Sequence, residues 1–179
     1  MAETPRKWMI RSLQTHLISE FQARGFILSP VDRKLPRQVQ VYNALGILRR
    51  HTPHGIEQVE VVLSEPVRTS FAVEFGLVPL EGTDFPSGHY SAENTPVGWL
   101  NHYCRLRRKK WNVFSEWWRV RRWPWMKVKE LDYVDLAKHI ATLIPEIEQF
   151  FENGKCGPHV KLVSAADLPK GVAINMNTS

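Results

Sequence analysis

The first segment of the chain carries a helical repeat of apolar residues. Thr4 is suited to cap a helix, and Pro5 favours the first helical position, where its missing N–H costs nothing. Gly25 is a typical helix stop. Between them, one face is apolar at Met9, Leu13, Leu17 and Phe21, with Ile10 and Ile18 beside them. The pattern predicts an amphipathic helix from residue 4 to residue 25.

A second amphipathic pattern begins at Asp132, which we expect to be the N-cap residue. Pro145 lies inside this pattern and should kink the helix or divide it into two shorter pieces. Asn153-Gly154 predicts its end. The apolar face consists of Leu136, Ile140, Leu143, Ile147 and Phe150, with Ile144 and Phe151 beside them.

Between the two helices, apolar and polar residues alternate with the period of β-strands. Residues 37–64 predict two antiparallel strands joined by a turn at His51–Gly55. Residues 70–78 predict a third strand, with Phe71, Val73 and Phe75 on one face and Ala72 and Glu74 on the other. Shorter strands fit residues 101–108, 117–122 and 159–163, although residues 111–118 also fit a helical face.

The order of helix, strands and helix predicts an α+β fold. We expect an antiparallel sheet of about four to six strands with the N-terminal and C-terminal helices packed on one face. Residues 1–153 should form a single domain, and residues 154–179 a C-terminal extension that is partly flexible. The Pro-rich and Gly-rich residues 80–98 predict a long loop that is functional or mobile.

Positive charge is concentrated in one segment, residues 105–129. This segment holds ten of the 24 Lys and Arg residues, a single acid (Glu116) and five of the seven Trp residues, so its formal charge is +9. The remaining 14 bases and 17 acids give −3, so the rest of the chain is slightly acidic. Attraction to acidic partners is therefore expected of this segment rather than of the whole protein.

Arginine and tryptophan together predict a surface that binds a partner. They dominate protein interfaces, which favours an acidic protein partner. They also neutralise phosphates and stack on bases, which leaves nucleic acid as the alternative. A structural interpretation stays open as well, in which Trp111, Trp117 and Trp118 pack in the core under arginine side chains. The predicted surface is Arg107, Arg108, Lys109, Lys110, Trp117, Trp118, Arg119, Arg121, Arg122 and Trp123.

The sequence lacks the motifs of most familiar enzymes. It has no nucleophile elbow and no glycine-rich phosphate loop. Two weak metal leads, His51-Thr52-Pro53-His54 and Cys156-Gly157-Pro158-His159, have no complement at recognisable spacing, so we expect turn residues there. We therefore expect a binding or accessory protein without catalytic residues, metal or cofactor, although an enzyme of unrecognised type stays possible.

The composition suits a cytoplasmic protein. The chain of 179 residues is 43% hydrophobic and 23% charged, as in ordinary globular domains, and no stretch reaches the length of a membrane-spanning helix. We therefore expect no membrane partner. Cys104 and Cys156 could form one disulfide, but a core of this size does not need it, so we expect reduced thiols.

An ordered series of short motifs adds a family resemblance over about residues 8–152. The motifs are Leu17 to Phe26, ending in Arg24-Gly25-Phe26; Phe71 to Pro79; Tyr103 to Arg108, followed by Trp117-Trp118; and the C-terminal helix. In these the chain resembles the bacterial family called domain of unknown function 4304. The resemblance implies an α+β fold in a cytoplasmic bacterial protein, of an accessory or immunity type, with no catalytic residue or cofactor to carry over. The basic runs and the tail after Gly154 depart from the family pattern.

Overall fold

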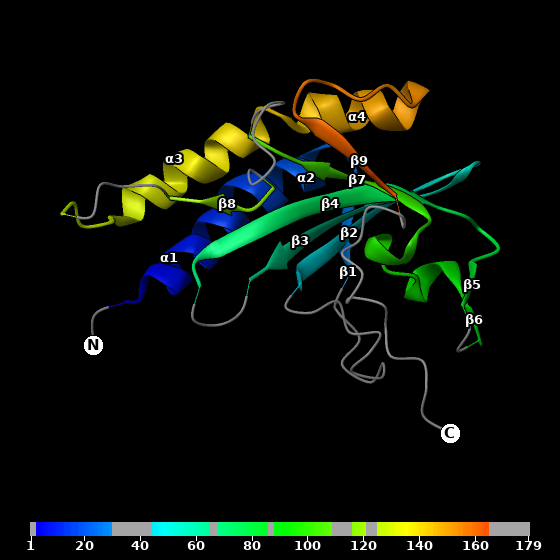
Figure 1. Cartoon of the computed structure of the whole chain (residues 1–179), viewed down its shortest axis with the longest axis horizontal. Coiled ribbons are helices and arrows are strands. Elements are labelled where there is room, and N and C mark those ends of the chain that lie inside the picture. The colour runs from blue at the N-terminus through cyan, green and yellow to red at the C-terminus, as the bar shows by residue number, and fades with distance from the viewer. Residues whose placement is uncertain are drawn as a thin grey trace.

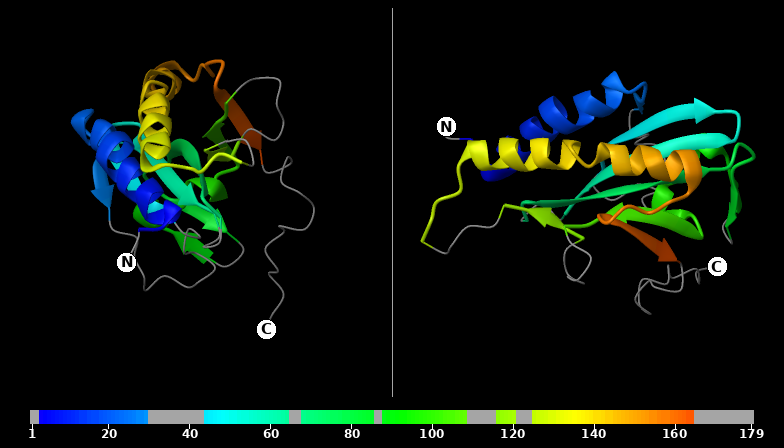
Figure 2. Two further views of the ribbon diagram at one scale, coloured as in Figure 1. Left: turned by 90° about the vertical axis from the view of Figure 1, so that its left-hand side faces the viewer. Right: turned by 90° about the horizontal axis from the view of Figure 1, so that it is seen from above.

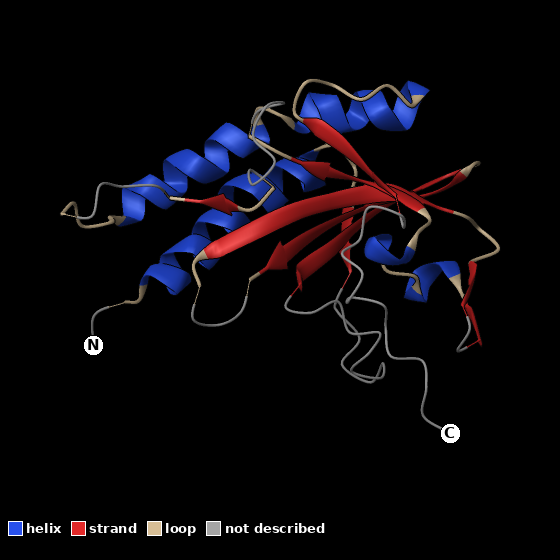
Figure 3. Ribbon diagram, in the orientation of Figure 1, coloured by secondary structure: helices blue, strands red, loops and turns tan. Residues whose placement is uncertain are grey.

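The computed structural model describes residues 3–29, 44–64, 68–85, 88–108, 116–120 and 125–164. Within these ranges, an antiparallel sheet of seven strands is covered on one face by helices from both ends of the chain (Figure 1 and Figure 3). The predicted α+β fold is confirmed. Figure 2 shows that the N-terminal and C-terminal helices lie side by side on the same face of the sheet.

Six strands follow one another across the sheet, and the seventh adds to one of them. The order is β1 (Ile27–Ser29), β2 (Ala44–Thr52), β3 (Gly55–Leu63), β4 (Ser70–Val78), β7 (His102–Leu106) and β9 (Val160–Ser164), while β8 (Trp118–Arg119) pairs with β4. All these pairs are antiparallel.

The predicted turn between the first two long strands is confirmed. Thr52 pairs with Gly55, so Pro53 and His54 form a two-residue loop. Gly55 has a φ of +149°, and a Cβ there would come within 2.7 Å of the Val78 carbonyl oxygen, so only glycine fits. The part of the predicted first strand before residue 44 lies outside the described residues.

The N-terminal helix is continuous but changes its winding in the middle. It runs through α1 (Pro5–Ser12), the π-helix η1 (Leu13–Ile18) and α2 (Ser19–Ala23), capped by Thr4 as predicted. Its apolar residues recur every four positions, which exceeds the 3.6 residues of an α-helical turn. The wider π turn compensates for this difference, so that Met9, Leu13, Leu17 and Phe21 all remain buried.

The C-terminal helix is divided as the proline predicts. α3 (Glu130–Ala141) ends before α4 (Ile144–Asn153), whose first turn contains Pro145, and Gly154 ends α4 in the left-handed conformation. The predicted N-cap role of Asp132 is wrong by three positions. Lys129 is the N-cap, and Asp132 caps the helix from its third position by accepting a hydrogen bond of 2.8 Å from the Lys129 backbone N–H.

The segment predicted as a long loop has local structure and covers part of the second sheet face. It contains the hairpin β5 (Thr83–Phe85) and β6 (Gly88–Tyr90) and the 3₁₀ turns η2 (Ala92–Asn94) and η3 (Val97–Trp99). The turns pack on the sheet face away from the helices. There, apolar side chains from this segment and from the strands form a small cluster: Ile56, Val78, Ala92, Val97, Leu100, Tyr103 and Val163. The main core lies on the opposite face, under the helices.

The sheet continues past the predicted domain boundary at residue 153. β9 pairs with β7 over five residues, from His102 opposite Ser164 to Leu106 opposite Val160. Residues 154–164 therefore belong to the domain. The rest of the predicted extension, residues 165–179, lies outside the described residues.

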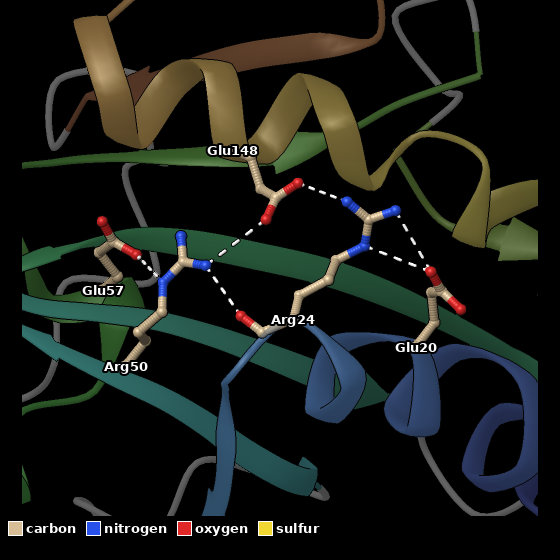
Figure 4. Close-up of polar contacts among 5 residues, drawn as sticks. All are labelled: Glu20, Arg24, Arg50, Glu57 and Glu148. Atoms are coloured by element: carbon tan, nitrogen blue, oxygen red, sulfur yellow. Dashed lines mark hydrogen bonds and ion pairs between the residues drawn. The ribbon is translucent and has the colours of Figure 1, made fainter.

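An ionic network fastens the helices to the sheet (Figure 4). Glu148 on α4 contacts Arg24 at 2.5 Å and Arg50 on β2 at 3.5 Å. Arg24 also pairs with Glu20 at 3.2 Å, and Arg50 pairs with Glu57 on β3 at 2.7 Å. Because these side chains are partly buried, water screens the network less than it screens surface pairs.

None of the helices within the described ranges has the length and apolar character needed to cross a membrane.

Candidate functional site

The structure places five of the ten residues of the predicted surface. Arg107 and Arg108 follow β7, Trp117 precedes β8, and β8 consists of Trp118 and Arg119. A guanidinium N–H of Arg108 donates to the backbone oxygen of Arg119, which joins the two basic stretches. The other five predicted residues, Lys109, Lys110, Arg121, Arg122 and Trp123, lie outside the described residues.

Trp118 corrects the predicted surface, because its side chain belongs to the core. The indole is 1% exposed, and its N–H donates to the Leu106 backbone oxygen at 3.3 Å. The Arg108 guanidinium lies 5.6 Å from the ring centroid, and the His139 ring packs on its edge at 6.1 Å. The structural interpretation therefore holds for Trp118, which cannot contact a partner in this conformation.

Part of the positive charge of the segment is neutralised within the fold. Arg105 on β7 donates to Glu74 on β4 and, at 2.7 Å, to Glu116. Lys161 on β9 donates to the other oxygen of Glu116. Arg105 is thus held between two carboxylates on the sheet face away from the helices. Because these neutralise its charge, it adds little to the positive electrostatic potential at the surface.

Exposed aromatic and basic side chains lie instead at β8 and just before it, and again from residue 125 to the start of α3. In the part of the chain that the structure describes, nine large hydrophobic side chains are exposed, and four of them fall between residues 117 and 131. In the same stretch Arg119, Lys127 and Lys129 are also exposed. We call this the β8–α3 surface: Trp117, Arg119, Trp125, Met126, Lys127, Lys129 and Leu131.

The β8–α3 surface overlaps only partly with the predicted one. Trp117 is 40% exposed and Trp125 is 77% exposed, so both indoles present apolar area to solvent. The sequence prediction ended at Trp123 and missed Trp125, Met126 and Leu131. Their position in the sequence could have indicated exposure. They follow a basic run and lie at the start of an amphipathic helix, outside the strands and the apolar helix face that form the core.

A second polar feature crosses the sheet on the face away from the helices. Glu60 on β3, Glu74 on β4, Arg105 on β7 and Lys161 on β9 are successive cross-strand partners. Arg105 pairs with Glu74 and Glu116, and Lys161 pairs with Glu116. Among the residues that the structure describes, Glu60 forms no ion pair, although the charge of Arg49 lowers its pKa. The sequence does not show which carboxylate lies beside Glu74, because that depends on how the strands pair.

Glu60 is a buried carboxyl group with an incomplete set of partners. It is 1% exposed, and its Oε1 accepts hydrogen bonds from the Val97 backbone N–H at 2.8 Å and from Gln58 at 2.7 Å. Within the described ranges, its buried Oε2 has no hydrogen-bond partner. The pKa of Glu60 is raised to about 7, chiefly by burial and also by the nearby charge of Glu74, against the effect of the two hydrogen bonds.

The carboxyl group of Glu60 has the pKa of a general acid or base but is not accessible to a substrate. A pKa near neutrality suits proton transfer, and perturbed groups of this kind often mark functional sites. However, the Glu60 side chain is sealed under η3, so no substrate reaches it in this conformation. We therefore assign Glu60 to the interior of the fold rather than to a reaction centre.

The two sequence leads for metal binding lie in different parts of the fold, one at the β2–β3 hairpin and one between α4 and β9. His51 lies 3.5 Å from Glu93, His54 lies in the β2–β3 turn, and His159 contacts Glu146 at 2.7 Å. Across the residues that the structure describes, no group of three or more His, Cys, Asp or Glu side chains is arranged to hold a metal ion.

No protein-family model matches this chain, and no curated protein or solved structure is significantly similar to it. The resemblance to the domain of unknown function 4304 therefore stays a prediction.

Proposed function

We propose that the chain is a non-catalytic binding protein that recognises an acidic protein partner through the β8–α3 surface. The observation that supports this proposal is that Trp117, Trp125, Arg119, Lys127 and Lys129 are all exposed and lie close together in the sequence. Tryptophan, methionine and arginine are enriched at protein interfaces, and tryptophan and arginine are among the residues that supply most of the binding energy. Exposed lysines add positive charge, which favours an acidic partner.

Two features favour a protein partner over nucleic acid. Arg105 is held by Glu74 and Glu116, and Arg108 packs over Trp118, so fewer cations of the segment face outward than the sequence suggests. The surface also begins beside Glu116 and ends beside Glu130. A phosphate backbone requires many exposed cations and is repelled by carboxylates, whereas a protein interface tolerates both signs.

The test is affinity capture from the native host with the full chain, followed by affinity measurement on the captured protein. Trp117→Ala with Trp125→Ala should weaken binding at least about tenfold, because each ring is a candidate hot spot. Arg119→Glu with Lys127→Glu should slow association. The matched control is Lys138→Glu with Lys155→Glu, which reverses two exposed charges elsewhere and should leave binding unchanged.

Salt and nuclease treatment distinguish the two partner classes. An acidic protein partner should remain bound after nuclease treatment and lose affinity gradually with salt. Binding of a labelled single-stranded oligonucleotide, with a steep fall of log affinity against log salt and the same loss in the variants, would overturn the protein proposal in favour of nucleic acid. Equal capture by the wild type and the Trp117→Ala/Trp125→Ala variant would show that another surface binds.

A further inference from the structure

The two cysteines of the chain, Cys104 and Cys156, lie on β7 and on the connection from α4 to β9. Cys104 is on β7, where its cross-strand neighbour is Phe75. The Phe75 ring packs against Phe150 and Phe151 of α4, at centroid distances of 5.5 and 5.9 Å. Cys104 belongs to the same core under the helices and is 0% exposed. Its thiol therefore lies between the sheet and α4.

The connection from α4 to β9 contains Cys156 and returns towards β7. After Gly154, the chain runs back along α4 towards the start of that helix (Figure 1). Two contacts fix its end: the His159 backbone N–H donates to Glu146 at 2.9 Å, and the Arg107 backbone N–H donates to the His159 oxygen at 2.9 Å. Cys156 lies between Gly154 and these anchors.

The two thiols are close enough to influence one another. Burial raises the pKa of Cys104, and the charge and hydrogen bonding of Cys156 raise it further. Their accessibility differs, because Cys104 is buried while Cys156 is exposed. An oxidant in solution therefore reaches Cys156 first, and the thiol beside it is Cys104.

We propose that Cys104 and Cys156 form a reversible disulfide that fastens the α4–β9 connection to β7. With oxidised glutathione as the oxidant, the Cys156 thiolate attacks one glutathione sulfur, forms a mixed disulfide and releases one glutathione thiolate. The Cys104 thiol then loses its proton to solvent and attacks the Cys156 sulfur. The Cys104–Cys156 bond forms, a second glutathione leaves and takes up a proton, and the two electrons reside in two reduced glutathione molecules.

The environment of Cys104 sets the pace of this reaction. Because the thiolate is the attacking species and its formation is disfavoured by burial, the second step should be slower than the first. It should also accelerate as the pH rises. The exposed position of Cys156 lets a reductant reopen the bond, as in other accessible disulfides that act reversibly.

The experiment treats the full chain with oxidised glutathione in native buffer and follows the intact mass. The wild type should pass through one glutathione adduct and end with the loss of two hydrogen atoms, and proteolysis should release a linked Cys104–Cys156 peptide. Cys104→Ala should stop at a stable adduct on Cys156, and Cys156→Ser should show neither adduct nor disulfide. Dithiothreitol should restore the original mass of the wild type.

Three results would overturn the inference: a wild-type adduct that never resolves, a disulfide that joins two chains, or a linked peptide that appears only in denaturant. Because Cys156 is exposed, Cys156→Ser should retain the circular dichroism and melting curve of the reduced wild type. If this variant is folded, the absence of a disulfide in it is caused by the missing Cys156 thiol and not by misfolding.

Discussion

The buried carboxyl of Glu60 should make the free energy of unfolding depend on pH. Its pKa is raised from 4.5 to about 7 in the folded protein. Each pKa unit corresponds to about 1.4 kcal/mol, so ionised Glu60 should destabilise the fold by about 3 kcal/mol relative to its protonated form. For a carboxyl group whose folded pKa is raised, the folded state binds the proton more tightly. This contribution to stability is complete below pH 4.5 and is lost as the pH rises through about 7.

Glu60→Gln isolates this effect, because glutamine keeps the shape and the acceptor oxygen for Val97 and Gln58 but cannot ionise. Relative to the wild type, the variant should gain about 3 kcal/mol of stability between pH 4.5 and pH 8, most of it between pH 5 and pH 7.

The assay is urea unfolding of both proteins at pH 5, 6, 7 and 8. At each pH the free energy of unfolding of the wild type is subtracted from that of the variant, so that the contributions of other titrating groups cancel. The matched control is Glu152→Gln, which changes an exposed carboxyl at the end of α4 and should follow the wild-type profile. Parallel profiles for Glu60→Gln and the wild type would refute the reasoning, because they would show that Glu60 ionises as easily in the folded chain as in the unfolded one.

Three further measurements check the packing, the helix cap and the cross-link. Trp118→Ala should lower the free energy of unfolding by about 3 to 5 kcal/mol, since the indole is 1% exposed; a change below 1 kcal/mol in urea unfolding would place it outside the core. Asp132→Ala should cost about 1 kcal/mol in the same assay by removing the cap of α3, while Asp135→Ala on the exposed side should cost less. Oxidation of the Cys104–Cys156 pair should add about 4 kcal/mol, because the bond closes a long loop of the unfolded chain, and a lower midpoint after oxidation would indicate strain.

The sequence by itself determined the elements whose cause is local. Apolar spacing placed both long helices, the position of Pro145 divided the second, and alternation placed Ser70–Val78 with Phe71, Val73 and Phe75 towards the core. These features depend on contacts within a few residues or on which face is apolar. The four-residue apolar repeat is also consistent with the π turn at Leu13–Ile18, although the repeat alone did not predict it.

Only the tertiary structure decided how the charges and rings are used. The basic segment reads as one cationic stretch, but Arg105 faces Glu74 and Glu116, while Trp118 enters the core because β8 pairs with the start of β4. Glu60 stands beside Glu74, and Cys156 reaches Cys104, through pairings between distant parts of the chain. Exposure and ion pairing depend on such distant neighbours, and a pattern read along a single chain contains no record of them.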